Sequence, residues 1–251
     1  MFSLAMMKQK KFQQRSAVIG LLQVYTNRNR PIYPFMCDSS CNIIAEVKKA
    51  SPSAGLINTV DPATQATLYQ KAGAKAVSVL ADSEYFGGSY DDVYQVAQAV
   101  SLPVLCKEFI CYPEQIDIAY NAGADMILLI ASLLTSDELH YLFTYTTSKG
   151  LLPLIEVHTI SELDSVLTLQ PDYIMVNIRN LNTLELEYDT AIATLKSIPD
   201  NIQKICASGI DNAETIQRIK NQTGTTTFLV GTALMKANDP QKLLQELSHV
   251  C

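Results

Sequence analysis

The stretch "NIIAEVKKASPSAG", residues 42–55, joins an apolar run typical of a buried strand to charged residues and a Ser-Pro-Ser turn. Successive side chains of a strand alternate between its two faces, so Glu46 and Lys48 share one face and the neighbouring apolar side chains share the other. Charge at the end of a buried strand costs free energy unless it is paired or serves a function. The stretch therefore predicts a strand that ends either in a structural ion pair or in an active site.

Seven further apolar runs follow along the chain. Each is nearly continuous in Val, Ile, Leu and Ala, as is typical of parallel strands that are covered on both faces. Eight strands in 251 residues predict a single (β/α)8 TIM barrel. The seven runs are AVSVL from Ala76, LPVLCKEF from Leu102, MILLI from Met126, LPLIEV from Leu152, YIMVNI from Tyr173, KICASG from Lys204 and FLVG from Phe228.

Six segments between these runs have the apolar spacing of helices, with starts at Pro113 and Ser136 and ends at glycines such as Gly123 and Gly224. They cover residues 63–74, 90–100, 113–124, 136–150, 160–169 and 212–224. No composition break marks a second domain, so we expect an N-terminal helical extension over residues 1–41 and a barrel over residues 42–251. A doubly wound open sheet is the alternative, although its usual GxGxxG loop after the first strand is missing.

Composition restricts the function. The chain has 48% hydrophobic and 18% charged residues and a net charge of −6, which argues against a nucleic-acid partner but allows an anionic small molecule in a local cationic pocket. The six cysteines form no CxxC pair and the three histidines are scattered, so we expect reduced thiols, a cytoplasmic location and no metal site. The first 25 residues predict an amphipathic helix, and no segment reaches the ~20 apolar residues of a membrane span.

Polar residues gather where the predicted strands end, which is where (β/α)8 barrels place their reacting groups. They are Glu46, Lys48, Lys107, Glu108, Glu156, Asn177, Arg179, Ser208, Gly209, Gly231 and Thr232. Any one of these charges is more often a rim charge or a structural ion pair, but their recurrence at one level of several strands favours an active site.

The last two strand ends carry small residues. Ser208-Gly209 and Gly231-Thr232 let an anion approach backbone N–H groups, which predicts a phosphate site, although turns alone would also explain the glycines. Phe86 either covers a ligand or simply packs, and His158 is assigned no role. Cys106 and Cys206 are expected to be core thiols.

The same segments resemble, in order and spacing, those of the indole-3-glycerol phosphate synthase family, from about Asn42 to near the C-terminus. The resemblance implies ring closure of 1-(2-carboxyphenylamino)-1-deoxyribulose 5-phosphate with loss of carbon dioxide and water, in tryptophan biosynthesis. It implies a phosphorylated small-molecule substrate as partner and no cofactor or metal. A monomer is expected, with association with other tryptophan-pathway enzymes left open.

The resemblance also implies roles for individual residues. Lys107 is similar to the general acid and Glu156 to an acid/base group, while Lys48 resembles a binding or proton-relay lysine oriented by Glu46. Substrate contacts are implied for Asn177, Arg179, Ser51 and Phe86, and phosphate or ribulosyl-chain contacts for Ser51, Ser208, Gly209, Gly231 and Thr232. The family places its N-terminal extension over the barrel mouth, where the basic stretch KQKKFQQR either helps to hold the phosphate or forms a solvated helix face.

Four positions depart from the family pattern: Ala207 replaces a glutamate, Ile178 an asparagine, Cys106 an arginine and Ala54 a lysine. Three hypotheses follow. The chain is an active synthase, a diverged paralogue with an altered substrate or slow turnover, or a catalytically silent phosphate-binding barrel. The retention of Lys107 and Glu156 argues against the third.

Overall fold

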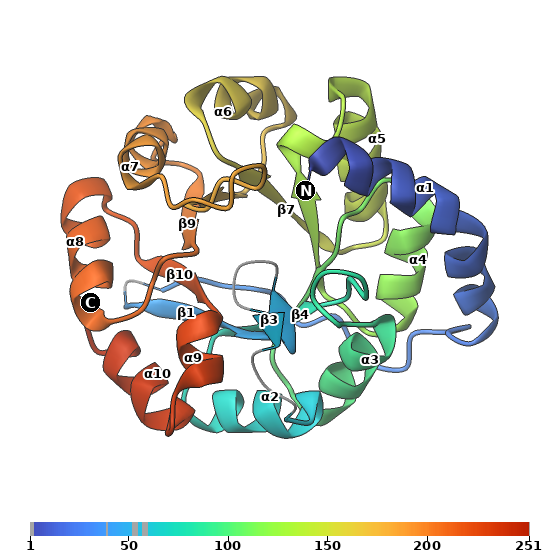
Figure 1. Cartoon of the computed structure of the whole chain (residues 1–251), viewed down its shortest axis with the longest axis horizontal. Coiled ribbons are helices and arrows are strands. Elements are labelled where there is room, and N and C mark those ends of the chain that lie inside the picture. Colours follow the sequence, from blue (N-terminus) through green and yellow to red (C-terminus); the bar gives the residue numbers. More distant parts are fainter. Residues whose placement is uncertain (1–2, 39, 52–54, 57–59, 251) are drawn as a thin grey trace.

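The structure is a computed structural model that describes residues 3–38, 40–51, 55–56 and 60–250. Its centre is a closed barrel of eight parallel strands surrounded by helices (Figure 1). β1 pairs with both β10 and β4, which closes the barrel. The barrel strands are β1 (Asn42–Val47), β4 (Ala76–Leu80), β5 (Val104–Lys107), β6 (Met126–Ile130), β7 (Leu152–Val157), β8 (Tyr173–Asn177), β9 (Gln203–Ala207) and β10 (Thr227–Val230). The predicted (β/α)8 barrel is confirmed, and the doubly wound alternative is wrong.

Helices follow the strands around the barrel. The six predicted helices are confirmed as α2 (Pro62–Lys71), α3 (Tyr90–Ala99), α4 (Pro113–Asn121), α5 (Ser136–Ser148), α6 (Ile160–Val166) and α8 (Ala213–Thr223). The glycine stop after α8 is a left-handed residue, Gly224 with φ 71°, a conformation that glycine adopts without strain.

Several short elements were not predicted from the sequence. They are α7 (Tyr188–Ser197), α9 (Thr232–Lys236), α10 (Pro240–Ser248), the hairpin of β2 (Ala50–Ser51) and β3 (Gly55–Leu56), and three 3-10 turns at Leu21–Gln23, Ala131–Leu133 and Leu167–Leu169. The hairpin strands, the 3-10 turns and α9 have two to five residues each, which are too few to show a periodicity. In α10 the signal was present, because Leu243, Leu244 and Leu247 have helical spacing and the last two are fully buried.

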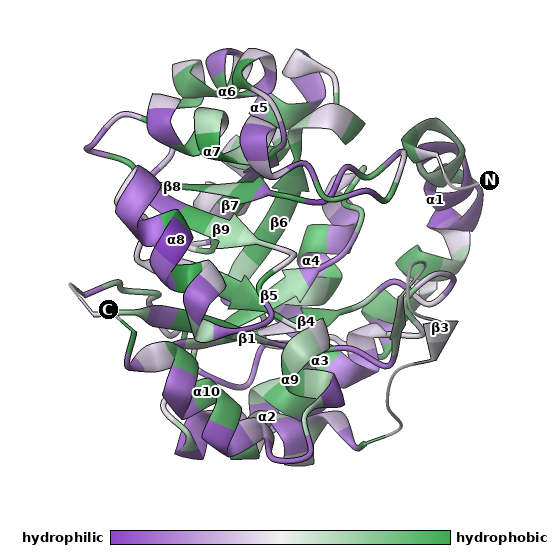
Figure 2. Cartoon of the chain, turned by 60° about the vertical axis from the view of Figure 1, so that its left-hand side comes forward, coloured by the Kyte–Doolittle hydropathy of each residue, from purple (hydrophilic) through white to green (hydrophobic). Residues whose placement is uncertain are grey.

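The alternation of strand side chains divides the hydrophobic core into two layers. Ile44, Leu105, Leu154 and Met175 belong to a cluster inside the barrel, whereas their sequence neighbours pack between the strands and the helices. Figure 2 shows hydrophobic strands enclosed by helices whose outward residues are hydrophilic. Because Glu46, Lys107, Glu156 and Asn177 continue the inner alternation at the strand ends, their side chains are directed to the mouth of the barrel.

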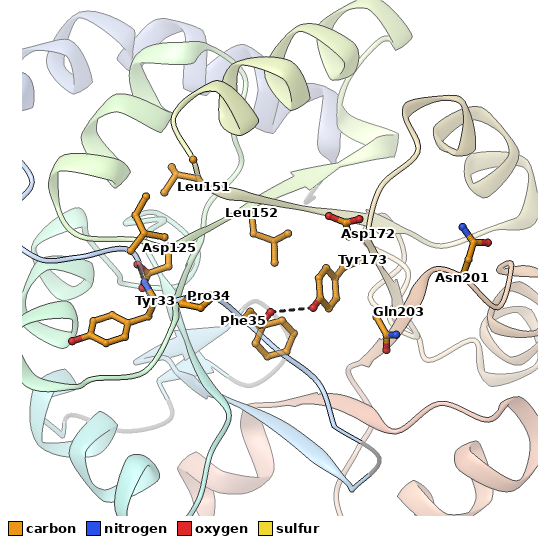
Figure 3. A pocket seen from close by; sticks show the side chains of 12 residues that line it. Tyr33, Pro34, Phe35, Asp125, Leu151, Leu152, Asp172, Tyr173, Asn201 and Gln203 are labelled. Atoms are coloured by element: carbon orange, nitrogen blue, oxygen red, sulfur yellow. Dashed lines mark hydrogen bonds between the residues drawn. The ribbon is translucent and has the colours of Figure 1, made fainter.

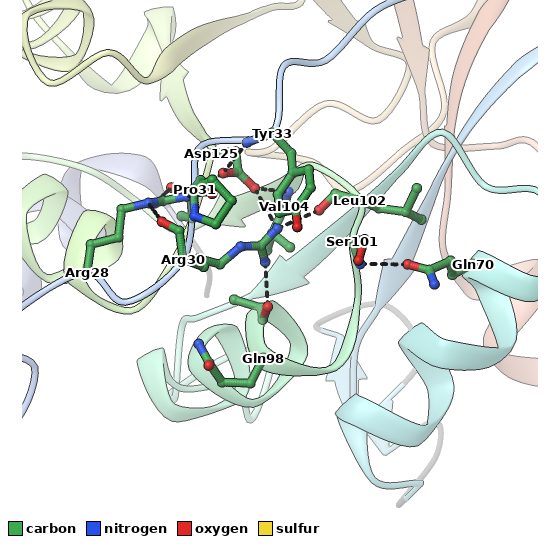
Figure 4. A network of polar contacts seen from close by, with 12 residues as sticks. Arg28, Arg30, Pro31, Tyr33, Gln70, Gln98, Ser101, Leu102, Val104 and Asp125 are labelled. Atoms are coloured by element: carbon green, nitrogen blue, oxygen red, sulfur yellow. Dashed lines mark hydrogen bonds and ion pairs between the residues drawn. The ribbon is translucent and has the colours of Figure 1, made fainter.

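The chain enters the barrel through helix α1 (Leu4–Gly20) and a segment that crosses to the opposite end of the strands. Figure 4 shows how this segment is held. Arg28 donates to Asp125 at 2.5 Å, and Arg30 approaches the other Asp125 oxygen at 3.4 Å. Asp125 also accepts from the backbone N–H groups of Tyr33 and Val104. This buried network ties residues 28–33 to the start of β6. The division at residue 41 stays a prediction.

Candidate active site

A cavity of about 640 Å³ opens at the carboxyl ends of the barrel strands. Most of the predicted site residues line it: Glu46, Lys48, Phe86, Lys107, Asn177, Arg179, Ser208, Gly209, Gly231 and Thr232. Glu156 lines a smaller adjoining recess that shares Lys107 and Asn177 with the main cavity. Residues that are up to about 190 positions apart in the sequence therefore meet at one place, as the strand-end pattern predicted.

A second cavity of about 510 Å³ lies at the other end of the barrel, lined by residues such as Phe35, Leu152 and Tyr173 (Figure 3). Tyr173 donates its hydroxyl to the carbonyl of Phe35 at 3.0 Å, so its polar atom is already used. None of the predicted site residues lines this cavity. The chemistry therefore belongs to the cavity at the carboxyl ends of the strands.

Glu46 links two lysines at the mouth of the barrel. Its Oε1 lies 2.9 Å from Lys48 Nζ and its Oε2 lies 2.9 Å from Lys107 Nζ. Burial alone would raise the pKa of Glu46, but the two ammonium groups outweigh burial and hold this pKa at about 2. Burial alone would lower the pKa of Lys107, but the carboxylates of Glu46 and Glu156 raise it above its ordinary value. Lys107 is therefore a protonated cation directed into the cavity.

Only one of the two carboxylate oxygens of Glu156 has a hydrogen-bond partner among the described residues. Its Oε1 accepts from the Asn177 side-chain amide at 3.0 Å, and the Asn177 oxygen in turn accepts from the backbone N–H of Arg179 at 3.0 Å. The other oxygen, Oε2, is buried and has no hydrogen-bond partner among the described residues. A buried carboxylate oxygen without a partner is costly, and a bound molecule with a donor group would satisfy it.

An apolar wall faces these polar groups. Phe86 and Phe109 pack with ring centroids 6.3 Å apart, and Leu181 completes the wall of both recesses. Phe86 therefore packs against Phe109 and also lines the cavity, and its expected contact with a ligand stays a prediction. This wall offers a flat apolar surface beside the Lys107 ammonium, which suits an aromatic ring.

Small residues form the opposite side of the cavity. Ser208 and Gly209 both have left-handed backbones, with φ 68° and 65°. A Cβ atom on Gly231 would lie 2.3 Å from Glu46 Oε1 and 2.9 Å from Lys48 Nζ, so only glycine leaves room for this ion pair. The backbone between Gly231 and Thr232 can therefore come close to the lysine.

Three of the four departures from the family pattern can be placed. Ile178 and Cys106 lie in the outer layer of the core, away from the cavity. Ala207 belongs to the inner cluster and pairs in register with Asn177, so it changes the wall of the barrel interior. Ala54 and the side chain of Ser51 lie outside the described residues. Cys206 is fully buried, as predicted for a core thiol.

The cations of the basic stretch of α1 pair with carboxylates of the barrel and its helices, while other residues of the stretch face solvent. Lys11 is 4% exposed, and its ammonium lies 2.8 Å from Asp82 Oδ2 and 2.7 Å from Glu108 Oε1. Lys8, Lys10 and Arg15 pair with other barrel carboxylates. None of the four cations lines the cavity. Lys10 and Arg15 stay partly exposed, and Gln9, Gln13 and Gln14 face solvent, so the stretch is in part a solvated helix face. A phosphate contact from this stretch stays a prediction. Glu108 was predicted among the strand-end charges, and its carboxylate forms the ion pair with Lys11.

The sequence missed several residues of the site. Phe109 follows Lys107 by two positions, so strand alternation could have found it. Lys236 is the last residue of α9, and Leu181 lies in the loop after β8. No pattern in the sequence indicates that either side chain lines the cavity. Across the described ranges, no group of three or more His, Cys, Asp or Glu side chains has the arrangement of a metal site. No described helix has the length and apolar character needed to cross a membrane.

Comparison with known proteins agrees with this geometry. The family profile described as indole-3-glycerol phosphate synthase matches residues 4–247. Indole-3-glycerol phosphate synthase of an Exiguobacterium species is 44% identical over 207 residues, which cover 82% of this chain and 81% of the relative. The Bacillus cereus enzyme of that name is 42% identical over 239 residues, which cover 93% and 94%.

Solved structures support the fold alone. N-acetylmannosamine-6-phosphate 2-epimerase from Clostridium perfringens superposes with a TM-score of 0.63 at 14% identity, over 89% of this chain and all of that one. Thiamine phosphate pyrophosphorylase from Pyrococcus furiosus gives a TM-score of 0.61 at 14% identity, over 84% and 95%.

Proposed function

The chain belongs to the indole-3-glycerol phosphate synthase family, and from this premise we propose that it converts 1-(2-carboxyphenylamino)-1-deoxyribulose 5-phosphate into indole-3-glycerol phosphate, carbon dioxide and water. The observation that carries the proposal is the Lys107 ammonium, which Glu46 holds at 2.9 Å at the edge of a cavity with one apolar and one glycine-rich side. That cavity has a distinct place for each part of such a substrate.

The aryl ring lies against Phe86, Phe109 and Leu181, and the phosphate lies beside Ser208, Gly209, Gly231 and Thr232. Lys236 lines the same side of the cavity and adds a cation that suits a phosphate. The sugar carbons then lie between the two ends, next to Lys107, Lys48 and Glu156. Asn177 and Arg179 hold the substrate at the end of β8, and Ser51 contacts it from the end of β2.

Ring closure needs an acid. Lys107 donates its proton to the carbonyl oxygen of the sugar as the aryl carbon that bears the carboxylate attacks the carbonyl carbon. Loss of carbon dioxide from that carbon returns the electron pair to the ring. Glu156 then takes the proton that the sugar carbon next to the nitrogen loses as the indole forms, and gives it to the new hydroxyl, which leaves as water. Lys48, oriented by Glu46, stabilises the negative charge that develops on oxygen.

Ala207 favours a second candidate, a diverged paralogue that works slowly or on a related aryl-amino sugar phosphate. Its methyl group lies in register with Asn177, where a carboxylate would reach the reacting centre. A catalytically silent binding barrel explains less, because it gives no reason for the retention of both Lys107 and Glu156. The proposal further includes a cytoplasmic monomer without a nucleic-acid or membrane partner and without a cofactor.

A fluorescence assay for indole formation with purified protein tests the proposal. The chain contains no tryptophan, so its own emission does not mask the product. The synthase predicts product from wild type and loss of product in Glu156→Gln. Absence of product from wild type would refute it. A gain of at least tenfold in kcat/KM from Ala207→Glu would instead support the slow paralogue.

A further inference from the structure

His158 stands beside Glu156 and is not used in the reaction described above. It follows β7 directly, two residues beyond Glu156, so strand alternation brings both side chains to the same side. Its Nε2 lies 3.6 Å from Glu156 Oε1, and its Nδ1 lies 3.4 Å from Glu162 Oε2. The side chain is 10% exposed, and Nε2 is buried without a hydrogen-bond partner among the residues that the structure describes.

Glu162 fixes the position of this imidazole. It lies in the first turn of α6, and its Oε2 accepts from the backbone N–H of His158 at 2.7 Å. One carboxylate oxygen thus faces both the backbone and the ring of the same residue. The imidazole is held between α6 and β7, and a rotation away from Glu156 would give up the Glu162 contact.

The acceptors beside the imidazole favour its protonated form. Glu156 faces it from β7, Glu162 from α6, and the backbone carbonyl of Arg179 from the loop after β8. Burial alone would lower the pKa of His158, but these acceptors outweigh burial and raise it above its ordinary value. The imidazolium is therefore the favoured form below neutral pH.

We infer that His158 is a positioning residue for the proposed reaction, because its imidazole, fixed by Glu162, lies 3.6 Å from Glu156 Oε1 and holds this carboxylate in place in the recess that it lines. This inference rests on the proposed function, since it assigns His158 a task through Glu156. When His158 is absent, Glu156 loses a neighbour that is a cation at acidic pH. The loss of His158 should therefore lower turnover most on the acidic side of neutral pH.

The test compares pH profiles of kcat/KM for wild type, His158→Gln and a matched control, His140→Gln. His140 is an exposed histidine on α5, so its loss removes the same chemical group far from Glu156. We expect kcat/KM of His158→Gln to fall by up to about tenfold on the acidic side of neutral pH, where the imidazole is protonated, and to change by less than twofold near pH 8.5. The profile of His140→Gln should superimpose on wild type.

A second measurement does not depend on the folding of the His158 variant. Coupling between two titrating groups is reciprocal, so the imidazole of His158, followed by NMR, should titrate about one pH unit lower in Glu156→Gln than in wild type. Superimposable acidic limbs together with an unchanged His158 titration would overturn the inference. Absence of product from wild type would overturn the proposed function and this inference with it, whereas product without a His158 effect would overturn the inference alone.

Discussion

The substitution Glu46→Gln tests the electrostatics of the barrel mouth. It keeps the shape of the side chain and removes the charge that two ammonium groups share at 2.9 Å each. The folded-state pKa of Glu46 is about 2, against an ordinary value of 4.5. At about 1.4 kcal/mol per pH unit, this difference corresponds to about 3 kcal/mol of stability at neutral pH, which agrees with the 3–5 kcal/mol typical of breaking a buried ion pair.

The pH dependence has a defined sign. Because the pKa of Glu46 is lower in the folded state, its contribution is complete above about pH 4.5 and is lost as the pH falls toward 2. Glu46→Gln should therefore unfold about 3 kcal/mol more easily than wild type near pH 7, and the difference should fall to about half near pH 3. For a chain of this length the melting temperature should drop by about 6–12 °C at neutral pH.

The assay is urea unfolding followed by circular dichroism at both pH values. The matched control is Glu246→Gln, because Glu246 and Lys242 form an exposed pair at 3.9 Å on α10. The control should change the free energy of unfolding by less than about 0.5 kcal/mol. Equal losses in the two variants, or a Glu46→Gln loss that does not shrink on acidification, would refute the reasoning.

Two further predictions concern residues that support the site. Gly231→Ala should lower kcat/KM at least tenfold in the fluorescence assay, because its methyl group would lie 2.3 Å from Glu46 Oε1. Unchanged kinetics would show that the ion pair of Glu46 and Lys48 can shift freely. Lys11→Met should lower the free energy of unfolding by about 3 kcal/mol in urea, because it leaves two buried carboxylates beside each other without their shared cation; a loss below about 1 kcal/mol would contradict this account of how α1 is attached.

The sequence predicted the barrel because each strand is a dense apolar run buried on both faces, so its signal does not depend on the rest of the fold. It also predicted which strand ends meet, because parallel strands in a closed barrel place their carboxyl ends at one rim. Glu46, Lys107, Glu156 and Asn177 were found in this way. Their common inward orientation follows from strand alternation alone.

The contacts that join distant segments could not be predicted. Nothing near Lys11 in the sequence indicates that it is paired with Asp82 and Glu108, which are more than 70 residues away. The same holds for Arg28 and Asp125. A solvated helix face and a helix face whose lysines pair with buried carboxylates have similar composition, and only the packing of α1 against the barrel distinguishes them. His158 was assigned no role from the sequence, because the role proposed for it depends on its distances to Glu156 and Glu162 in the folded chain.

The most direct test of the account concerns Lys107 as the acid that closes the ring. Lys107→Met keeps the length of the side chain and leaves Glu46 paired with Lys48. Substrate binding, followed by isothermal titration, should change by less than about tenfold, while the rate of product formation in a single turnover should fall by at least about a thousandfold. A Lys107→Met protein that binds substrate and forms product within tenfold of the wild-type rate would contradict the account.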